Sequence, residues 1–220
     1  VSCCFLLFLF LVVVSFSFLC WMDNFEKKQI YHDLVERLAE EENVVLVCGS
    51  GLSVSATFIN GSFPQELSWL GLLRHGIRQC EDLAPPDEKW GRWAREQQEK
   101  VDRGEIFPVA GEIVRFLKEE VSAHHYQVWL NEAFAGQKVT NDEVSSAMKG
   151  LVSVSQCYVT TTNYDSLLED MLGRVPLHYS DERSAIDDYL RKEKHHKVLH
   201  WHGHFSRARD VVLDASHYNE

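Results

Sequence analysis

Three short segments of this sequence combine residue types that do chemistry: GSGLS at 49–53, TTNYD at 161–165 and HWHGH at 200–204. Each follows or ends a β-branched or apolar run that predicts a strand. In an open α/β sheet the carboxyl ends of parallel strands meet at one edge, and such folds bind nucleotides there. We therefore expect the three segments to share one nucleotide site.

The first segment is rich in glycine. Glycines directly after a strand let backbone N–H groups approach a pyrophosphate, with the amino end of a helix beyond them. The G-x-G-x-x-G pattern is incomplete here, because Val54 stands where the third glycine belongs. A plain tight turn explains the segment equally well.

The second segment offers two polar side chains separated by one residue. Asn163 can donate and accept hydrogen bonds at once, which suits a ribose hydroxyl or an attacking water, and Asp165 can accept from an amide. The alternative is helix capping, because either side chain can satisfy free N–H groups of a helix that begins near Ser166. Both roles can coexist.

The third segment alternates His200, His202 and His204, which would project to one face of a strand. One interpretation is a metal site in a metal-dependent hydrolase, since imidazoles one residue apart can share a cation. Gly203 interrupts the strand pattern, however, and favours His202 as a general base just before a turn. Ordinary structural roles are expected for His200 and His204. Solvated positions are expected for His178, His195 and His196.

Alternating strands and helices must position these segments. Strands are expected at 44–48, 156–161, 197–201 and 210–213. Helices are expected at 24–42, 65–79, 88–103, 109–134, 141–152, 164–172 and 181–194. This order predicts an α/β fold with a Rossmann-like, doubly wound parallel sheet and a helical insertion.

Charge and cysteine content restrict the partners. Twenty-two basic and 33 acidic residues give a net charge of −11, which disfavours nucleic acid and anionic lipid surfaces. A nucleotide must then be held by local backbone donors. Cys48, Cys80 and Cys157 lack the C-x-x-C spacing of zinc and redox sites, so buried thiols in a reducing, cytoplasmic setting are expected.

Residues 1–21 form an apolar leader without a charged residue. The segment is about as long as a membrane span, so a membrane anchor or signal is one interpretation. The other is mis-annotated sequence upstream of a start at Met22. A membrane partner is expected only if residues 1–21 are translated.

The order of the motifs resembles the SIR2-like branch of the sirtuin superfamily, which occurs in bacterial anti-phage effectors and some eukaryotic proteins. That branch shows G-[AST]-G-x-S, a proline and a tryptophan, T-T-N-[YF]-D, and then H-G followed by a strand and a tyrosine. The positions that carry the resemblance are Gly49, Ser50, Gly51, Ser53, Pro64, Trp69, Thr161 to Asp165, His202, Gly203, Val211 to Leu213 and Tyr218.

The resemblance implies NAD as the substrate of an NAD+ hydrolase that cleaves the nicotinamide–ribose bond, in immune or stress signalling. It implies catalytic roles for His202, Asn163 and Asp165. Cofactor-binding roles would fall to Gly49, Ser50, Gly51, Ser53, Thr162 and Gly203. A catalytically silent NAD-sensing or assembly module is the alternative, and homo-oligomers stay open.

Two departures from the wider superfamily refine this expectation. Protein-deacylating sirtuins carry zinc-binding C-x-x-C pairs soon after H-G, whereas no cysteine follows His202 here. We therefore expect no zinc and no deacylation. The family also continues past the strand after H-G, so residues 22–220 are expected to be a SIR2-like NAD-binding domain that is incomplete at its carboxyl end.

Overall fold

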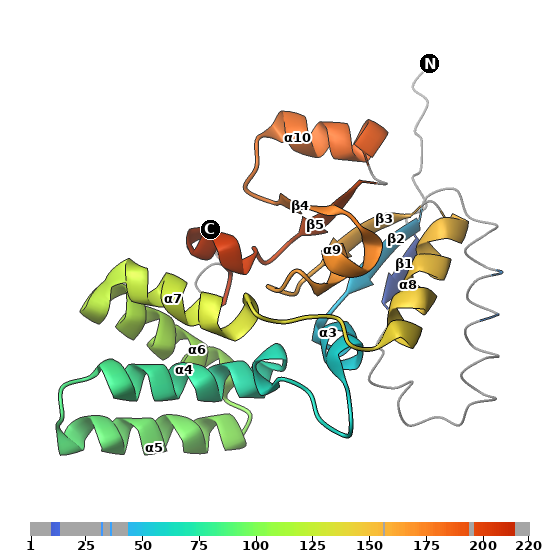
Figure 1. The fold of residues 1–220 in the computed structure, drawn as a ribbon. Coiled ribbons are helices and arrows are strands. Elements are labelled where there is room, and N and C mark those ends of the chain that lie inside the picture. Colours follow the sequence, from blue (N-terminus) through green and yellow to red (C-terminus); the bar gives the residue numbers. More distant parts are fainter. Residues whose placement is uncertain are drawn as a thin grey trace.

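The structure is a computed structural model that describes residues 10–13, 32, 36, 44–155, 157–193 and 196–213. A sheet with its covering helices forms one part of the molecule, and a block of helices lies beside it (Figure 1). The expected helix at 24–42 and Tyr218 lie outside the described residues, apart from His32 and Glu36.

The sheet has five strands in the order β1-β2-β3-β5-β4, and every neighbouring pair is parallel. Their bounds are β1 Phe10–Val13, β2 Val44–Cys48, β3 Tyr158–Thr161, β4 Val175–His178 and β5 Lys197–His200. Cys48 pairs with Thr161, and Thr161 with His200. The three segments with chemical potential therefore begin at one edge of the sheet, as the sequence predicts.

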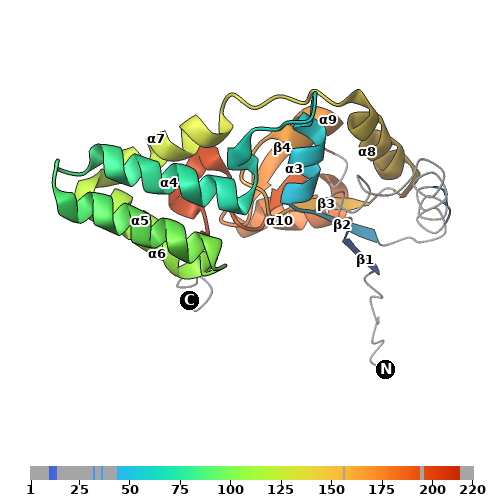
Figure 2. The same cartoon turned by 90° about the horizontal axis from the view of Figure 1, so that it is seen from below.

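Helices cover both faces of this sheet, which confirms the Rossmann-like α/β class (Figures 1 and 2). On one face lie α3 Ser50–Thr57, α8 Asp142–Ser155 and α9 Leu167–Leu172. Leu52, Met148 and Met171 from these helices share a core with Val198 of β5. Leu199, the next residue of β5, points to the other face and packs with Tyr189, just after α10 (Arg183–Asp188), in the π-helical turn Tyr189–Glu193.

The helical block is inserted between α3 and α8 and has a core of its own. It comprises the 3-10 turn η1 Gln65–Leu67, α4 Trp69–Leu83, α5 Glu88–Asp102, α6 Ile106–Arg115, the π-helix η2 Phe116–Ser122 and α7 Ala123–Phe134. Gly76 lets α4 approach closely, because a Cβ there would lie 2.9 Å from Ile113 and Trp129. Tyr164 and Val211 join the same core, so the block is tied to the loops at the sheet edge.

Several expected helices are confirmed with shifted ends. α5 and α8 match 88–103 and 141–152 closely. The expected helix at 65–79 is divided into η1 and α4, and α4 begins at Trp69, where Ser68 accepts a hydrogen bond from Gly71 N and caps the helix. The single helix expected at 109–134 is wrong, since the π-helix η2 and the extended backbone of Ser122 (φ −175°) divide it.

Two expectations about strands are also wrong. Residues 210–213 form no strand: the 3-10 helix η4 (Phe205–Asp210) precedes them, and Val211 and Leu213 are buried against the helical block. β4 was not expected at all. Its residues Val175 and Pro176 are exposed and only Leu177 and His178 are buried, so the strand lacks the alternating pattern that would reveal it.

The apolar leader contributes the edge strand β1, whose residues Phe10–Val13 pair with Val44–Val47. The rest of residues 1–21 lies outside the described residues. Among the residues that the structure describes, no helix is both long and apolar enough to cross a membrane.

Gly203 provides a test of the turn after β5. Its φ of +83° favours glycine, and a Cβ there would lie 2.3 Å from the Asp210 carbonyl oxygen. We expect Gly203→Ala to lower the free energy of unfolding by the backbone cost of about 1–2 kcal/mol plus the cost of the clash. Urea unfolding followed by circular dichroism measures it.

Gly104→Ala is the matched control, because Gly104 has a φ of +82° and no atom within 4 Å of the added Cβ. The difference between the two variants isolates the clash. Equal losses of stability would show that Gly203 is needed for its backbone angle alone.

Candidate functional site

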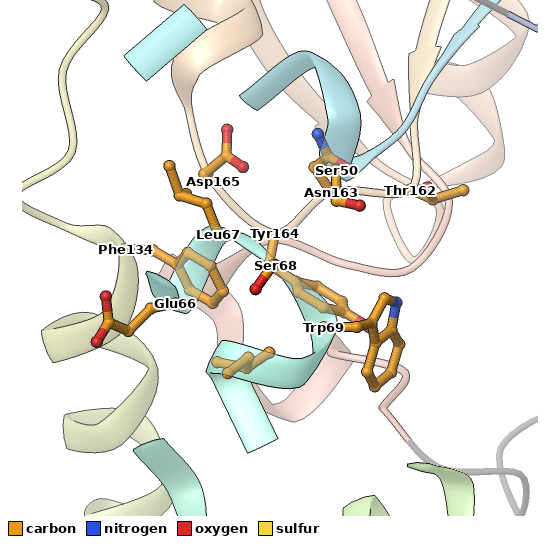
Figure 3. A pocket seen from close by; sticks show the side chains of 11 residues that line it. Ser50, Glu66, Leu67, Ser68, Trp69, Phe134, Thr162, Asn163, Tyr164 and Asp165 are labelled. Atoms are coloured by element: carbon orange, nitrogen blue, oxygen red, sulfur yellow. The ribbon is translucent and has the colours of Figure 1, made fainter. Parts of the chain in front are cut away.

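A pocket of about 390 Å³, counted to its open mouth, lies where the carboxyl edge of the sheet meets the helical block. Figure 3 shows Ser50, Thr162 and Asn163 gathered at one side and Ser68 and Trp69 at the other. The lining residues are Ser50, Glu66, Leu67, Ser68, Trp69, Leu72, Phe134, Thr162, Asn163, Tyr164 and Asp165.

A chain of hydrogen bonds links three of the predicted site residues. Asn163 Nδ2 donates to Ser53 Oγ at 2.7 Å, and Ser53 Oγ donates to Asp165 Oδ2 at 2.7 Å. All three residues are buried. One N–H of the Asn163 side-chain amide is donated to Ser53, and its Oδ1 is an acceptor that can receive a hydrogen bond from a ligand or a water.

Asp165 both caps a helix and lines the pocket. Its Oδ1 accepts from Leu167 N at 3.0 Å, at the start of α9. Burial raises the pKa of this carboxyl above its ordinary value, while the hydrogen bonds from Ser53 and Leu167 act in the opposite direction. The capping alternative is therefore confirmed for Asp165, and it coexists with a place in the pocket.

The two threonines fix the backbone that leads to Asn163. Thr161 Oγ1 donates to Cys48 O at 3.0 Å and accepts from Asn163 N at 3.0 Å. Thr162 N donates to the same Cys48 carbonyl at 3.1 Å. β2 and β3 are thus joined beyond their last paired residues, and Thr162 is held at the wall of the pocket.

The glycine segment starts α3 without a side-chain cap. Gly49 is the N-cap residue and provides no side-chain cap, and no acidic residue lies in the first turn. Uncapped N–H groups with a helix dipole behind them favour an anion. Ser50 lines the pocket, whereas Gly51 does not, and Ser53 lies inside the hydrogen-bond chain. Their predicted roles in binding phosphate remain predictions.

His202 lies after the end of β5 and is half-buried. Its carbonyl oxygen accepts from Val212 N at 2.9 Å, which closes the turn at Gly203. Burial lowers the pKa of the imidazole below its ordinary value of 6.5, so the ring is neutral at physiological pH and can accept a proton. His202 and Gly203 are not among the residues that line the pocket.

The histidines that do cluster are His178, His200 and His204. Their ring centroids are 4.9 Å apart for His200 and His204, 5.8 Å for His178 and His204 and 6.1 Å for His178 and His200. The expectation of a solvated His178 is wrong, because pairing of β4 with β5 places it directly beside His200 in the buried interior. His196 is exposed as expected, and His195 lies outside the described residues.

This cluster does not have the form of a metal site. Both nitrogens of His200 are engaged, by Asn163 O and Glu169 Oε1, and both nitrogens of His204 are engaged, by Ser166 Oγ and Ser206 Oγ. Within the described parts of the chain, no group of three or more His, Cys, Asp and Glu side chains is arranged to hold a metal ion. Strand β5 ends at His200, so His202 and His204 do not continue a strand face.

His204 is held as a neutral imidazole of one tautomer. Its Nδ1 accepts from Ser206 N at 3.3 Å and thereby caps η4, so the ring proton resides on Nε2 and is donated to Ser166 Oγ at 2.9 Å. Burial, with the neighbouring His200, His178 and Arg207, lowers the pKa of His204 to about 3. Its role is structural, as the sequence suggests.

Sequence reasoning missed the far wall of the pocket, where Trp69 is noted only as a position that carries the family resemblance. Glu66 and Ser68 come from the turn before α4, and Phe134 from the end of α7. Trp69 contacts Tyr164 edge to face, with ring centroids 6.4 Å apart. These residues look like ordinary helix and turn positions in the sequence, and only the packing of the helical block brings them to the sheet edge.

The family model of the SIR2-like domain matches residues 158–220. This segment is a SIR2-like domain sequence. The matched residues include Asn163, Asp165 and His202, whose site roles are predictions from the sequence, and the match connects this segment with a family that is NAD-dependent and generally enzymatic. No solved structure matches the chain. The glycine segment lies outside the matched residues, yet the fold brings it to the same edge as the SIR2-like segment.

Ser53 is expected to hold this site together. Ser53→Ala leaves Asn163 Nδ2 and Asp165 Oδ2 without their shared partner inside the protein. We expect the free energy of unfolding to fall by about 1–3 kcal/mol, the cost of unsatisfied buried polar groups. Urea unfolding measures this loss. The matched control is Ser55→Ala in the same helix, since Ser55 is also buried but lies outside this hydrogen-bond chain. Equal losses in both variants would contradict the bridging role.

His204 predicts how stability depends on pH. As pH falls below about 6.5, the unfolded chain binds a proton at this histidine that the folded protein does not bind until pH nears 3. Stability therefore falls on acidification, by at most about 1.4 kcal/mol per pH unit for one such group.

His204→Asn keeps an acceptor at the cap of η4 but does not titrate. Urea unfolding between pH 7 and pH 5 should show a shallower slope in this variant than in the parent. Part of the slope should remain, because burial also lowers the pKa of His178. An unchanged slope would show that His204 is not the group that titrates.

Proposed function

We propose that this protein is an NAD+ glycohydrolase that converts NAD+ and water to nicotinamide and ADP-ribose. The observation that carries the proposal is the Asn163–Ser53–Asp165 chain of hydrogen bonds, because Asn163 and Asp165 line a pocket of a SIR2-like, NAD-related fold. The family resemblance also implies catalytic roles in NAD+ cleavage for Asn163, Asp165 and His202.

The start of α3 suits the phosphates of NAD. Its first turn carries no capping side chain and no carboxylate, so the N–H groups and the helix dipole can meet an anion. This matters in a chain with a net charge of −11, since the overall field repels a dinucleotide. Gly49, Ser50 and Gly51 are the residues we assign to this contact.

The chemistry requires little beyond positioning. The bond between the nicotinamide nitrogen and ribose C1′ breaks with its electron pair leaving on nicotinamide, through an oxocarbenium-like transition state. A water adds to C1′ and gives up one proton. Asn163 Oδ1 would accept a hydrogen bond from that water or from a ribose hydroxyl, and neutral His202 would orient the ribose or take the proton. Asp165 would accept from the nicotinamide carboxamide.

The second candidate is an NAD-binding module without turnover. It is favoured by the fact that Asn163, Ser53 and Asp165 already satisfy one another, and that His202 does not line the pocket. Such a module would gain thermal stability from NAD and leave it intact, because a ligand that binds only the folded state raises the melting temperature.

Purified protein incubated with NAD+ should release nicotinamide and ADP-ribose, measured by chromatography. Asn163→Ala and His202→Ala should each lower turnover by about 100-fold or more. The first removes the group that binds the water or a ribose hydroxyl, and the second removes the group that orients the ribose or accepts the proton. His196→Ala is the control, because this histidine is exposed and lies outside the pocket. NAD that raises the melting temperature without being consumed would support the second candidate. Unchanged turnover in both site variants would refute the site assignment.

A further inference from the structure

A buried histidine contacts the main chain of Asn163, and a buried glutamate contacts that histidine. His200, the last residue of β5, is fully buried, and its Nδ1 lies 3.0 Å from the carbonyl oxygen of Asn163. Its Nε2 lies 2.6 Å from Oε1 of Glu169, which comes from α9 and is also buried. These two contacts use the whole hydrogen-bonding capacity of the imidazole.

The Asn163 carbonyl decides where the protons lie. A carbonyl oxygen only accepts, so His200 Nδ1 must carry a hydrogen. The 2.6 Å contact on the other side then holds one more proton between Nε2 and Oε1, either as a glutamic acid donating to a neutral ring or as an imidazolium donating to a carboxylate. In both cases Glu169 keeps the ring in the state that donates to Asn163.

Asn163 is therefore fixed at three points. Its amide N–H donates to Thr161 Oγ1, its side-chain nitrogen donates to Ser53 Oγ, and its carbonyl accepts from His200. The third contact is the one that holds the carbonyl of the peptide between Asn163 and Tyr164, so its loss removes a restraint on the orientation of that peptide. Tyr164 also lines the pocket, so a rotation of that peptide would move two wall residues and the Oδ1 of Asn163 together.

The arrangement is not one that stability alone would favour. Buried ionisable pairs often add little or nothing to stability, compared with apolar residues of the same volume. Glu169 Oε2 has, in addition, no hydrogen-bond partner among the described residues. Because the His200–Glu169 pair is costly to bury and holds the Asn163 carbonyl, a role in positioning Asn163 explains it better than a contribution to stability.

We propose that His200 and Glu169 are positioning residues that hold the main chain of Asn163 so that its side chain faces the reacting atoms. The proposal rests on the proposed NAD+ cleavage for its effect on turnover. The positioning itself is a property of the protein without NAD, and it can be measured separately.

Two variants of His200 separate positioning from packing. His200→Asn retains a side-chain N–H near the place of Nδ1, whereas His200→Leu has a similar branched shape and no donor. Both remove the partner of Glu169, so they share that loss of stability. We expect His200→Leu to lower kcat for NAD+ cleavage by about 10- to 100-fold with little change in KM, and His200→Asn to restore most of it.

A double-mutant cycle with Asn163→Ala tests whether His200 acts through Asn163. In the Asn163→Ala protein, His200→Leu should cause no further loss of kcat. Equal kcat in His200→Asn and His200→Leu, or a full extra loss in the Asn163→Ala background, would overturn the proposal.

Hydrogen exchange of the NAD-free protein distinguishes this proposal from the proposed function. Amides of residues 161–167 should exchange faster in His200→Leu than in His200→Asn, measured by mass spectrometry on proteins shown to be folded by circular dichroism. If this difference appears and the parent protein does not cleave NAD+, the proposed function fails and the positioning stands. If exchange is equal in the two variants, the positioning fails whatever the turnover.

Glu169 supplies a second pair of variants should His200→Leu not fold. The amide of Glu169→Gln can donate to Nε2 and keep the hydrogen on Nδ1, whereas Glu169→Leu cannot. Faster exchange at 161–167 in Glu169→Leu than in Glu169→Gln is expected. Identical exchange would overturn the role of Glu169.

Discussion

A carboxylate that is buried in a protein must find hydrogen-bond donors, and Asp165 finds them on two different elements. Ser53 of α3 donates to one oxygen, and the backbone of α9 donates to the other. The first contact fixes the distance between the glycine segment and the loop after β3, and through Ser53 it also fixes the amide of Asn163. The geometry of the pocket thus depends on satisfying one charged group.

The sequence predicts the part of the fold that is locally encoded. β2, β3 and β5 are β-branched runs that end in glycine or polar residues, so their existence and their shared edge could be expected. β4 could not, because an edge strand that begins with exposed Val175 and Pro176 shows no buried alternation. Val211 and Leu213 led to the prediction of a strand that is not formed. Their apolar character reflects burial against the helical block, and the local sequence cannot distinguish such burial from that of a strand.

The error over β4 explains the error over the histidines. His178 lies next to His200 only because β4 pairs with β5. Since β4 was not predicted, the polar residues near His178 in the sequence suggested that its side chain is exposed to solvent. The alternation of His200, His202 and His204 assumes a strand that continues through Gly203, but the ladder ends at His200 and Gly203 turns the chain with a positive φ. The place of Asn163 and Asp165 at the sheet edge could be predicted, because both lie on one locally encoded segment after β3. The contacts of β4 with β5 and of the inserted helices with the pocket could not be predicted.

The two sides of the pocket differ in charge. Both carboxylates of the lining, Glu66 and Asp165, lie away from Ser50 in the pocket (Figure 3), whereas the start of α3 at Ser50 presents a helix dipole and no acidic side chain in its first turn. Anionic phosphates are repelled by the first environment and attracted by the second. Under the proposed function, the cationic nicotinamide ring would therefore occupy the pocket and the pyrophosphate would lie at Gly49 and Ser50. The reacting C1′ would then fall between them, within reach of Asn163, which is held by hydrogen bonds to Thr161, Ser53 and His200.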